Sequence, residues 1–142
     1  MKKILVTGGC GFIGTKLIPS LLARNYKVIS IDTQYFGNYL PKNKNLSNIK
    51  MNVKDLKSHH LNNVDCVIHL AAISNDPAAL LDAQITWETN VLNTYNLLEL
   101  CKISKIKKFI FASSGSVYGV SKQKKVIETT DLVPISNYNK TK

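Results

Sequence analysis

The 142-residue sequence predicts a single α/β domain, residues 1–142, built on a doubly wound parallel sheet. Three observations support this prediction. Short apolar runs alternate along the chain with segments of helical periodicity. A glycine-rich turn, GGCGFIG at residues 8–14, directly follows the first apolar run. An acidic residue, Asp32, closes the second run, eighteen residues beyond the end of that turn.

Five short apolar runs are predicted to form the strands. They lie at residues 2–7, 27–32, 49–53, 64–72 and 107–112. The fourth run is almost continuously apolar, as expected of a strand that is buried on both faces of a parallel sheet. Right-handed crossovers between successive strands then give a Rossmann-type sheet with the strand order 3-2-1-4-5.

Apolar residues at helical spacing predict helices over residues 12–24 and 82–103. We expect Pro19 to kink the first helix and Asn25 to end it. Residues 75–77 can begin a further helix. The last segment, residues 137–142, has the pattern of the first turns of a helix.

The glycines at positions 8, 11 and 14 fit a turn that binds a dinucleotide. Gly8 can turn the chain sharply because it has no Cβ, and Gly11 leaves the backbone open to a ligand. Gly14 is expected to let the helix lie close to the strands. Unpaired N–H groups at the helix start, together with the helix dipole, suit a pyrophosphate. A tight turn without a ligand is the alternative, which the position after an N-terminal strand disfavours.

Two acids follow predicted strands. A carboxylate at the position of Asp32 accepts hydrogen bonds from the adenosine ribose and repels a 2′-phosphate, which favours NAD over NADP. The alternative is an ordinary surface acid at a strand end. Asp55 either binds the adenine or caps a helix, and the sequence leaves both interpretations open.

The segment YNKTK places Tyr138 and Lys142 four residues apart, on one face of a helix. A neighbouring ammonium group favours a phenolate, so this tyrosine could take a proton from a substrate hydroxyl. Ser114 follows the fifth predicted strand, at the edge where ligands of open α/β sheets bind, and could hold the reacting oxygen. Each feature alone is also compatible with an ordinary surface helix or polar turn.

The net charge is +10, yet the lysines are dispersed and Arg24 is the single arginine. We therefore favour a solvated lysine surface over a nucleic-acid interface. No apolar run approaches the length of a membrane span. Three widely spaced cysteines, without metal-ligand spacing, suggest no metal site, no disulfide framework and a cytoplasmic location.

A series of motifs carries a resemblance to a known family: TGGCGFIG at 7–14, Asp32, Asp55, HLAA at 69–72, Asn90, SSGSVYG at 113–119 and YNKTK at 138–142. In this order they resemble the extended short-chain dehydrogenase/reductases. More narrowly, the chain is similar to the NAD-dependent epimerase/dehydratase family, whose members act on nucleotide sugars.

The resemblance implies a role for each motif residue. The residues implied to bind the pyrophosphate are Gly8, Gly11, Phe12, Ile13 and Gly14. Those implied to surround the rest of the NAD are Asp32, Asp55, Leu56, Leu70, Ala71, Ala72 and Asn90. The implied catalytic residues are Ser114, Tyr138 and Lys142. His69 matches a strand position of the family and is interpreted as structural.

The resemblance also implies an activity. It points to an NAD-dependent nucleotide-sugar epimerase or oxidoreductase that transfers a hydride at a sugar hydroxyl carbon with the help of Tyr138. Dehydratases of the family carry an Asp-Glu pair where this chain has Gly115 and Ser116, which disfavours elimination of water. The alternative is an NAD-binding fragment without catalysis.

Members of the family continue past the position of Lys142 into a C-terminal substrate domain. The chain is therefore expected to be an incomplete NAD-binding domain, truncated before that domain. Family members form homodimers through helices beside the fourth and fifth strands. We regard dimerisation of this chain as doubtful, because one of those helices would only begin at Tyr138.

Overall fold

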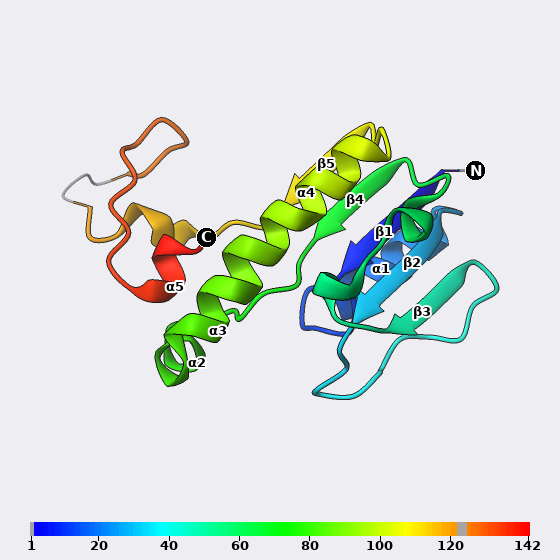
Figure 1. The fold of residues 1–142 in the computed structure, drawn as a ribbon, viewed down its shortest axis with the longest axis horizontal. Coiled ribbons are helices and arrows are strands. Elements are labelled where there is room, and N and C mark those ends of the chain that lie inside the picture. The colour runs from blue at the N-terminus through cyan, green and yellow to red at the C-terminus, as the bar shows by residue number, and fades with distance from the viewer. Residues whose placement is uncertain (1, 122–124) are drawn as a thin grey trace. The chain divides into compact units, whose positions relative to one another are not determined.

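The computed structural model describes residues 2–121 and 125–142 (Figure 1). Five parallel strands form one sheet: β1 (Lys3–Thr7), β2 (Lys27–Asp32), β3 (Leu46–Lys50), β4 (Cys66–His69) and β5 (Lys108–Phe111). The strands follow the order β3-β2-β1-β4-β5 across the sheet. This order confirms the predicted α/β fold and the predicted strand order.

The chain divides into two compact units, which are described separately. The first contains residues up to Ala71 together with Asn93–Ala112, and so includes the whole sheet. The second contains Ala72–Leu92 and Ser113–Lys142. Its helices are α2 (Asp76–Leu81), α3 (Ala83–Trp87) and α5 (Asn137–Lys140), with a π-helical turn at Glu88–Leu92 and a 3₁₀ turn at Gly115–Tyr118.

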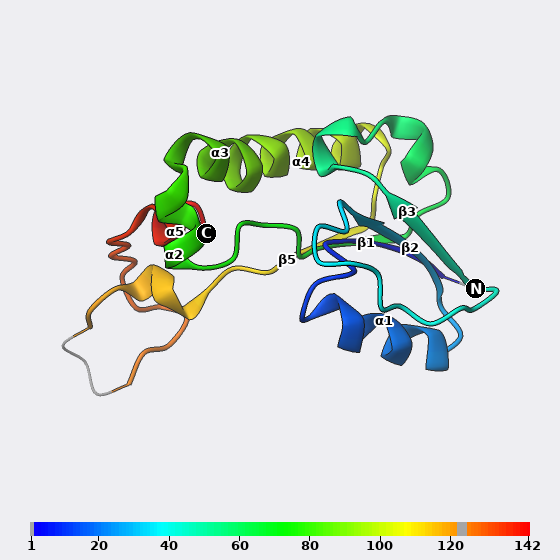
Figure 2. The same ribbon diagram turned by 90° about the horizontal axis from the view of Figure 1, so that it is seen from below.

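Within the first unit, helices cover both faces of the sheet. Figure 2 shows α1 (Gly14–Ala23) on one side of the sheet and α4 (Asn93–Ile103) on the other. Side chains of each strand alternate between the two faces, so each helix covers its own apolar cluster. The cluster with α1 contains Ile4, Val6, Ile18, Leu21, Leu22, Val28 and Ile68. The cluster with α4 contains Leu5, Ile31, Leu56, Leu61, Val64, Val67, Leu97 and Cys101.

Two of the predicted strands have different bounds in the structure, because pairing with a neighbouring strand decides which residues belong to each. The third was expected at residues 49–53, but β3 begins three residues earlier because Leu46 pairs with Val28 and Lys50 with Asp32. The fourth was expected at residues 64–72 and is shorter. It pairs with β1 only as far as Thr7, after which β1 gives way to the glycine-rich turn.

The predicted helix over residues 82–103 is three helical elements instead of one: α3, the π-helical turn and α4. Periodicity in the sequence did not reveal the π turn, because one extra residue in a single turn is hard to detect among the apolar positions of a long helical segment. Asn25 lies in the left-handed region with φ of 59°, which confirms the predicted end of α1. Asn75 caps α2 by accepting the Ala78 N–H at 2.8 Å, which confirms the predicted helix start.

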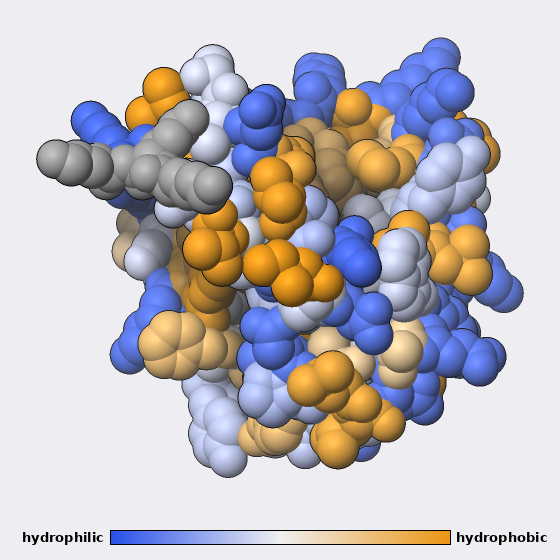
Figure 3. All heavy atoms as spheres, turned by 90° about the vertical axis from the view of Figure 1, so that its left-hand side faces the viewer, coloured by the Kyte–Doolittle hydropathy of each residue, from blue (hydrophilic) through white to orange (hydrophobic). Residues whose placement is uncertain are grey.

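Among the described residues, no helix is long and apolar enough to cross a membrane. Figure 3 shows a face of the molecule on which apolar residues are interleaved with hydrophilic ones. Large apolar residues exposed in the second unit include Leu80, Leu81, Val120 and Leu132.

Candidate cofactor-binding and catalytic residues

The glycine-rich turn has the geometry that the sequence predicted at its first glycine. Gly8 has φ of 70°, in the left-handed region, and its N–H donates to the Ile31 carbonyl at 2.8 Å. A Cβ at Gly8 would lie 2.6 Å from the Ala71 nitrogen and 2.8 Å from the Leu70 carbonyl carbon. Both neighbours are backbone atoms, so the turn lies directly against the chain that leaves β4. Glycine is therefore required here for conformation and for space.

Gly14 allows a close approach within the turn. A Cβ at Gly14 would overlap the backbone of Gly9, which lies just after β1. Spacing along the sequence did not show this contact. Close packing of the helix against the strands at Gly14 stays a prediction.

The start of α1 is open to an anion. Among the described residues, no hydrogen-bond acceptor pairs with the N–H groups of Phe12, Ile13 and Gly14, whereas Thr15 already donates to the Gly11 carbonyl at 3.0 Å. The Phe12 side chain is 90% exposed and does not fill the space. Free N–H groups at the start of a ten-residue helix are suited to a phosphate. These residues therefore fit the pyrophosphate of a dinucleotide.

Asp32 connects the end of β2 to the glycine-rich turn. Its Oδ2 accepts the Cys10 N–H at 2.9 Å, and its Oδ1 accepts the Gln34 N–H at 2.6 Å. A carboxylate has about four lone-pair sites, so each oxygen can still accept a further hydrogen bond. The two backbone bonds hold the carboxylate in place, as a ribose-binding acid requires.

Asp55 does not cap a helix. The 3₁₀ turn Val53–Asp55 is capped by Asn52, whose Oδ1 accepts the Lys54 N–H at 3.1 Å, and Asp55 is the exposed last residue of that turn. The capping interpretation was therefore wrong, and contact with adenine stays a prediction. Leu56, also predicted to lie beside the adenine, has its side chain buried in the core under α4.

A buried polar chain that the sequence did not predict supports the end of β4. His69 is 1% exposed and hydrogen-bonds through Nδ1 to Thr7 Oγ1 at 2.5 Å and through Nε2 to Thr94 Oγ1 at 2.9 Å. Thr7 Oγ1 also accepts the Ala71 N–H at 3.3 Å. These bonds join β1, β4 and α4, in agreement with a structural role for His69. They also fix the backbone at Leu70 and Ala71, two of the predicted cofactor residues.

The predicted catalytic residues all lie in the second unit, where α5 packs against α2, α3 and the 3₁₀ turn. Ser114 caps that turn, accepting the Ser116 N–H at 3.2 Å, and its hydroxyl hydrogen-bonds to Ser116 Oγ at 2.7 Å. Tyr138 lies in α5 and is half-buried. Burial lowers the pKa of the Lys142 ammonium, and the Lys142 carbonyl accepts the Ser113 hydroxyl at 2.9 Å.

Asn90 supports the same unit through its side-chain amide. It is 3% exposed and forms hydrogen bonds to both the N–H and the carbonyl of Ile73, at 2.8 and 3.0 Å. Its Nδ2 also donates to Thr141 Oγ1 at 3.0 Å. Ala72, predicted to line the cofactor, immediately precedes Ile73 and is half-buried. Thr141 was not among the predicted site residues, because one threonine between Tyr138 and Lys142 carries no sequence signal of its own.

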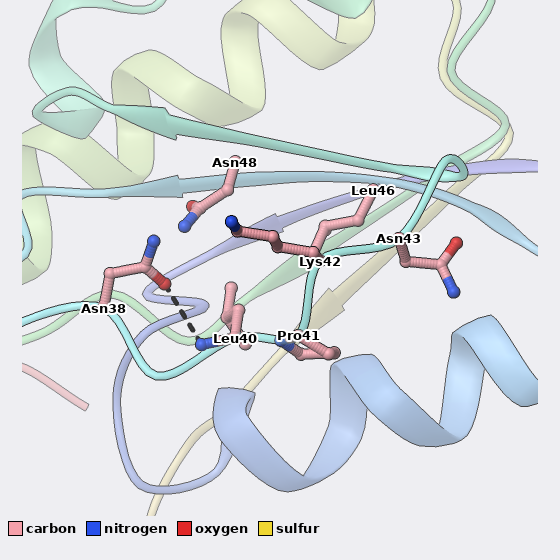
Figure 4. Close-up of a pocket in the computed structure, with 7 residues that line it drawn as sticks. All are labelled: Asn38, Leu40, Pro41, Lys42, Asn43, Leu46 and Asn48. Atoms are coloured by element: carbon pink, nitrogen blue, oxygen red, sulfur yellow. Dashed lines mark hydrogen bonds between the residues drawn. The ribbon is translucent and has the colours of Figure 1, made fainter.

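A hollow of about 300 Å³ lies between the chain after β2 and the sheet (Figure 4), and none of the predicted site residues lines it. Its lining residues are Asn38, Leu40, Pro41, Lys42, Asn43, Leu46 and Asn48. Burial raises the pKa of the Cys10 thiol, which lies 3.7 Å from Asn38 Oδ1. Among residues 2–121 and 125–142, no group of three His, Cys, Asp or Glu side chains could hold a metal ion.

A parallel sheet in this strand order, with a left-handed Gly8 before a helix start and an acid closing β2, defines the first unit as a dinucleotide-binding domain of the Rossmann class. Over residues 4–142 the chain matches the NAD dependent epimerase/dehydratase family, and it belongs to that family.

Three relatives illustrate the match. A UDP-glucose epimerase of Bacillus subtilis, described as uncharacterized, is 41% identical over 155 residues, covering 99% of this chain and 48% of that protein. The UDP-N-acetylglucosamine 4-epimerase of Methanobrevibacter ruminantium, solved with UDP-N-acetylmuramic acid, has a TM-score of 0.92 and 32% identity, over 99% of this chain and 46% of that one. The UDP-glucose 4-epimerase of Thermus thermophilus, solved with NAD, has a TM-score of 0.88 and 30% identity, over 98% and 47%.

The chain thus spans about half the length of the relatives that it matches. The matched half includes every residue that the sequence assigned to the cofactor or to catalysis.

Proposed function

We propose that this chain is the NAD-binding part of a nucleotide-sugar epimerase or oxidoreductase. The observation that carries the proposal is the coupling of the glycine-rich turn to Asp32 through the Cys10 N–H, beside the open start of α1. This arrangement offers a pyrophosphate site and a ribose site at one edge of the sheet. The family match and the NAD and UDP-sugar complexes of the related structures support the same ligands.

The proposed assignment of the cofactor residues follows the motifs of the family, and the geometry supports it at the glycine-rich turn and at Asp32. Gly8, Gly11, Phe12, Ile13 and Gly14 would bind the pyrophosphate. Asp32 would bind the ribose, and Asp55 with Leu56 would lie at the adenine. Leu70, Ala71, Ala72 and Asn90 would line or support the remaining length of the NAD. When bound, NAD supplies an acceptor and donor of hydride at a sugar carbon.

The protein's own groups would handle the proton. Tyr138 would take the proton from the sugar hydroxyl, and Ser114 would hold that oxygen by a hydrogen bond. The Lys142 ammonium would favour the phenolate form of the tyrosine by its positive charge. With no acid pair at Gly115 and Ser116, the residues present would suit oxidation of the sugar carbon by bound NAD and return of the hydride, rather than loss of water.

A second candidate is an NAD-binding protein without catalysis. The same observations at the glycine-rich turn and at Asp32 support it, because they concern the cofactor alone. The two candidates share the cofactor site and differ only in whether Tyr138 acts on a substrate.

Two measurements test the proposal on the protein. Calorimetric titration with NAD is expected to show saturable binding that weakens at least about tenfold in Asp32→Ala, since hydrogen bonds to a charged group contribute about 1.5–3 kcal/mol. Turnover of UDP-sugars is expected to be lost in Tyr138→Phe, while NAD binding is kept. Absence of NAD binding by the unmodified protein contradicts both candidates. Binding without turnover of any UDP-sugar favours the second.

A further inference from the structure

The segment that carries Tyr138 and Lys142 has little stability of its own. α5 is only four residues long, Asn137–Lys140. Isolated helices of this length are not stable in water, because too few hydrogen bonds offset the cost of nucleation. The orientation of the segment must therefore come from contacts with the rest of the second unit.

The C-terminal end of the segment is held by a buried side-chain pair. Thr141 is 5% exposed, and its hydroxyl accepts from Asn90 Nδ2 at 3.0 Å while donating to the Tyr138 carbonyl at 2.9 Å. The hydroxyl thus connects Asn90 directly to the backbone of Tyr138. The Thr141 hydroxyl has a single hydrogen to donate, and that hydrogen goes to the Tyr138 carbonyl. The rotation of the O–H bond is therefore fixed.

Asn90 is itself fixed. Its Oδ1 accepts the Ile73 N–H at 2.8 Å, which requires the NH₂ group to lie on the other side, toward the Ile73 carbonyl and Thr141. The residue lies in the π-helical turn Glu88–Leu92. A π turn adds one residue to the helical register, and each residue of an α-helix turns the side-chain direction by about 100°. The turn therefore decides that an amide, rather than a neighbouring side chain, points at Thr141.

The N-terminal end of the segment is held by a second polar pair. Ser136 caps α5 by accepting the Asn139 N–H at 3.1 Å, and its hydroxyl donates to the Asp76 carboxylate at the start of α2. The Ser136 hydroxyl thus links the first turn of α5 to α2. In the same way, Thr141 links the C-terminal end of α5 to the π-helical turn.

We propose that Asn90 with Thr141, and Asp76 with Ser136, are positioning residues that set the orientation of Tyr138 and Lys142 for proton transfer. The inference builds on the proposed function, in which Tyr138 takes the proton. None of the four residues needs to touch the substrate. Their effect is on the rate of the chemical step, because displacement of a reacting group by about 1 Å can lower that rate about a hundredfold.

The test compares substitutions of Thr141 in the protein, with UDP-sugar turnover and amide hydrogen exchange as readouts. Thr141→Val keeps the shape and removes both hydrogen bonds, and it is expected to lower kcat about tenfold to a hundredfold with little change in KM. Thr141→Ser keeps the hydroxyl and is expected to retain most of kcat. Thr129→Val, at an exposed threonine of the same unit, is the matched control.

Hydrogen exchange keeps the inference testable if the protein proves not to be an enzyme. In Thr141→Val the amides of α5 are expected to exchange at least about tenfold faster, while those of α1 exchange as before. A Thr141→Val protein with unchanged kcat and unchanged α5 exchange overturns the inference. So does a Thr141→Ser protein that loses as much kcat as Thr141→Val. If the unmodified protein shows no turnover but Thr141→Val still exchanges faster in α5, the proposed function is contradicted. The role of Thr141 in holding α5 then remains supported.

The second link is tested by Asp76→Ala against Asp76→Asn, since the amide oxygen of Asn can still accept from Ser136. Asp76→Ala is expected to lower kcat and to speed exchange in α5, and Asp76→Asn to retain most of both properties. Equal effects of the two substitutions contradict a role for this hydrogen bond in positioning Tyr138.

Discussion

Replacement of Gly8 by alanine tests whether the glycine-rich turn lies against the end of β4 as closely as the structure indicates. The substitution adds one methyl group, and two separate effects follow from its surroundings. Gly8 has φ of 70°, where a residue with a Cβ is disfavoured by about 1–2 kcal/mol. The added Cβ would also meet the Ala71 nitrogen at 2.6 Å and the Ala71 Cα at 2.8 Å.

Backbone atoms cannot rotate away from the methyl group as a side chain could, so the turn or the chain after β4 must move. Overpacking of this kind typically destabilises by about 1–3 kcal/mol. The sum predicts that Gly8→Ala lowers the free energy of unfolding by about 2–5 kcal/mol.

Two other glycines provide matched controls. Gly37 also has a positive φ, 91°, but the three atoms nearest to a Cβ there all belong to the exposed side chain of Tyr39, the nearest at 3.2 Å. Gly37→Ala should therefore show the conformational effect alone, about 1–2 kcal/mol. At Gly115 a Cβ would meet nothing within 4 Å, so Gly115→Ala should change stability by about 0.5 kcal/mol or less.

Urea unfolding of the three variants and the unmodified chain, followed by circular dichroism, gives the free energies of unfolding. Gly8→Ala is expected to lose about 1–3 kcal/mol more than Gly37→Ala. If the two variants lose the same amount, the close approach of Gly8 to Leu70 and Ala71 is refuted, and only the left-handed conformation remains to explain that glycine.

Two further predictions concern the core under α4. Leu97→Ala should lower the free energy of unfolding by about 2–5 kcal/mol, because the Leu97 side chain is 1% exposed. Leu98→Ala, at a residue 41% exposed, should lower it by about 1 kcal/mol or less. Equal losses of the two variants in urea unfolding would contradict the placement of α4. Burial raises the pKa of the Cys101 thiol to about 11, so the unfolded chain releases this proton at lower pH than the folded chain does. Stability should consequently fall as the pH rises from about 9 to about 11, and the fall should be smaller in Cys101→Ala; the same fall in both proteins would show that other groups cause it.

Much of the fold could be predicted from local pattern. Strands β1, β2 and β5 lie within one residue of the predicted runs, because each is a short apolar segment bounded by polar residues. The strand order also followed, since right-handed crossovers leave few topologies for a chain of alternating strands and helices. β3 was misplaced because its residues, LSNIK, are largely polar, and only pairing with β2 selects them over the neighbouring apolar residues.

For the candidate site too, some properties followed from the sequence and others only from the tertiary structure. The sequence alone determined the residue types: a glycine where the chain needs a left-handed turn, an acid at the end of β2, and a tyrosine and lysine four residues apart. These are local properties, fixed by spacing and by the backbone that each residue allows. Together with Asp55, HLAA at 69–72, Asn90 and SSGSVYG at 113–119, they were sufficient to indicate the family to which the chain belongs.

Only the tertiary structure decided which atoms meet. The contact of Gly14 with Gly9, the bonds of His69 to Thr7 and Thr94, and the link from Asn90 to Thr141 join residues that no periodicity connects. Such contacts depend on the register of strands and on a π-helical turn, both of which result from packing of the whole unit. A threonine between Tyr138 and Lys142 therefore gained its proposed role only when the buried amide of Asn90 was found beside it.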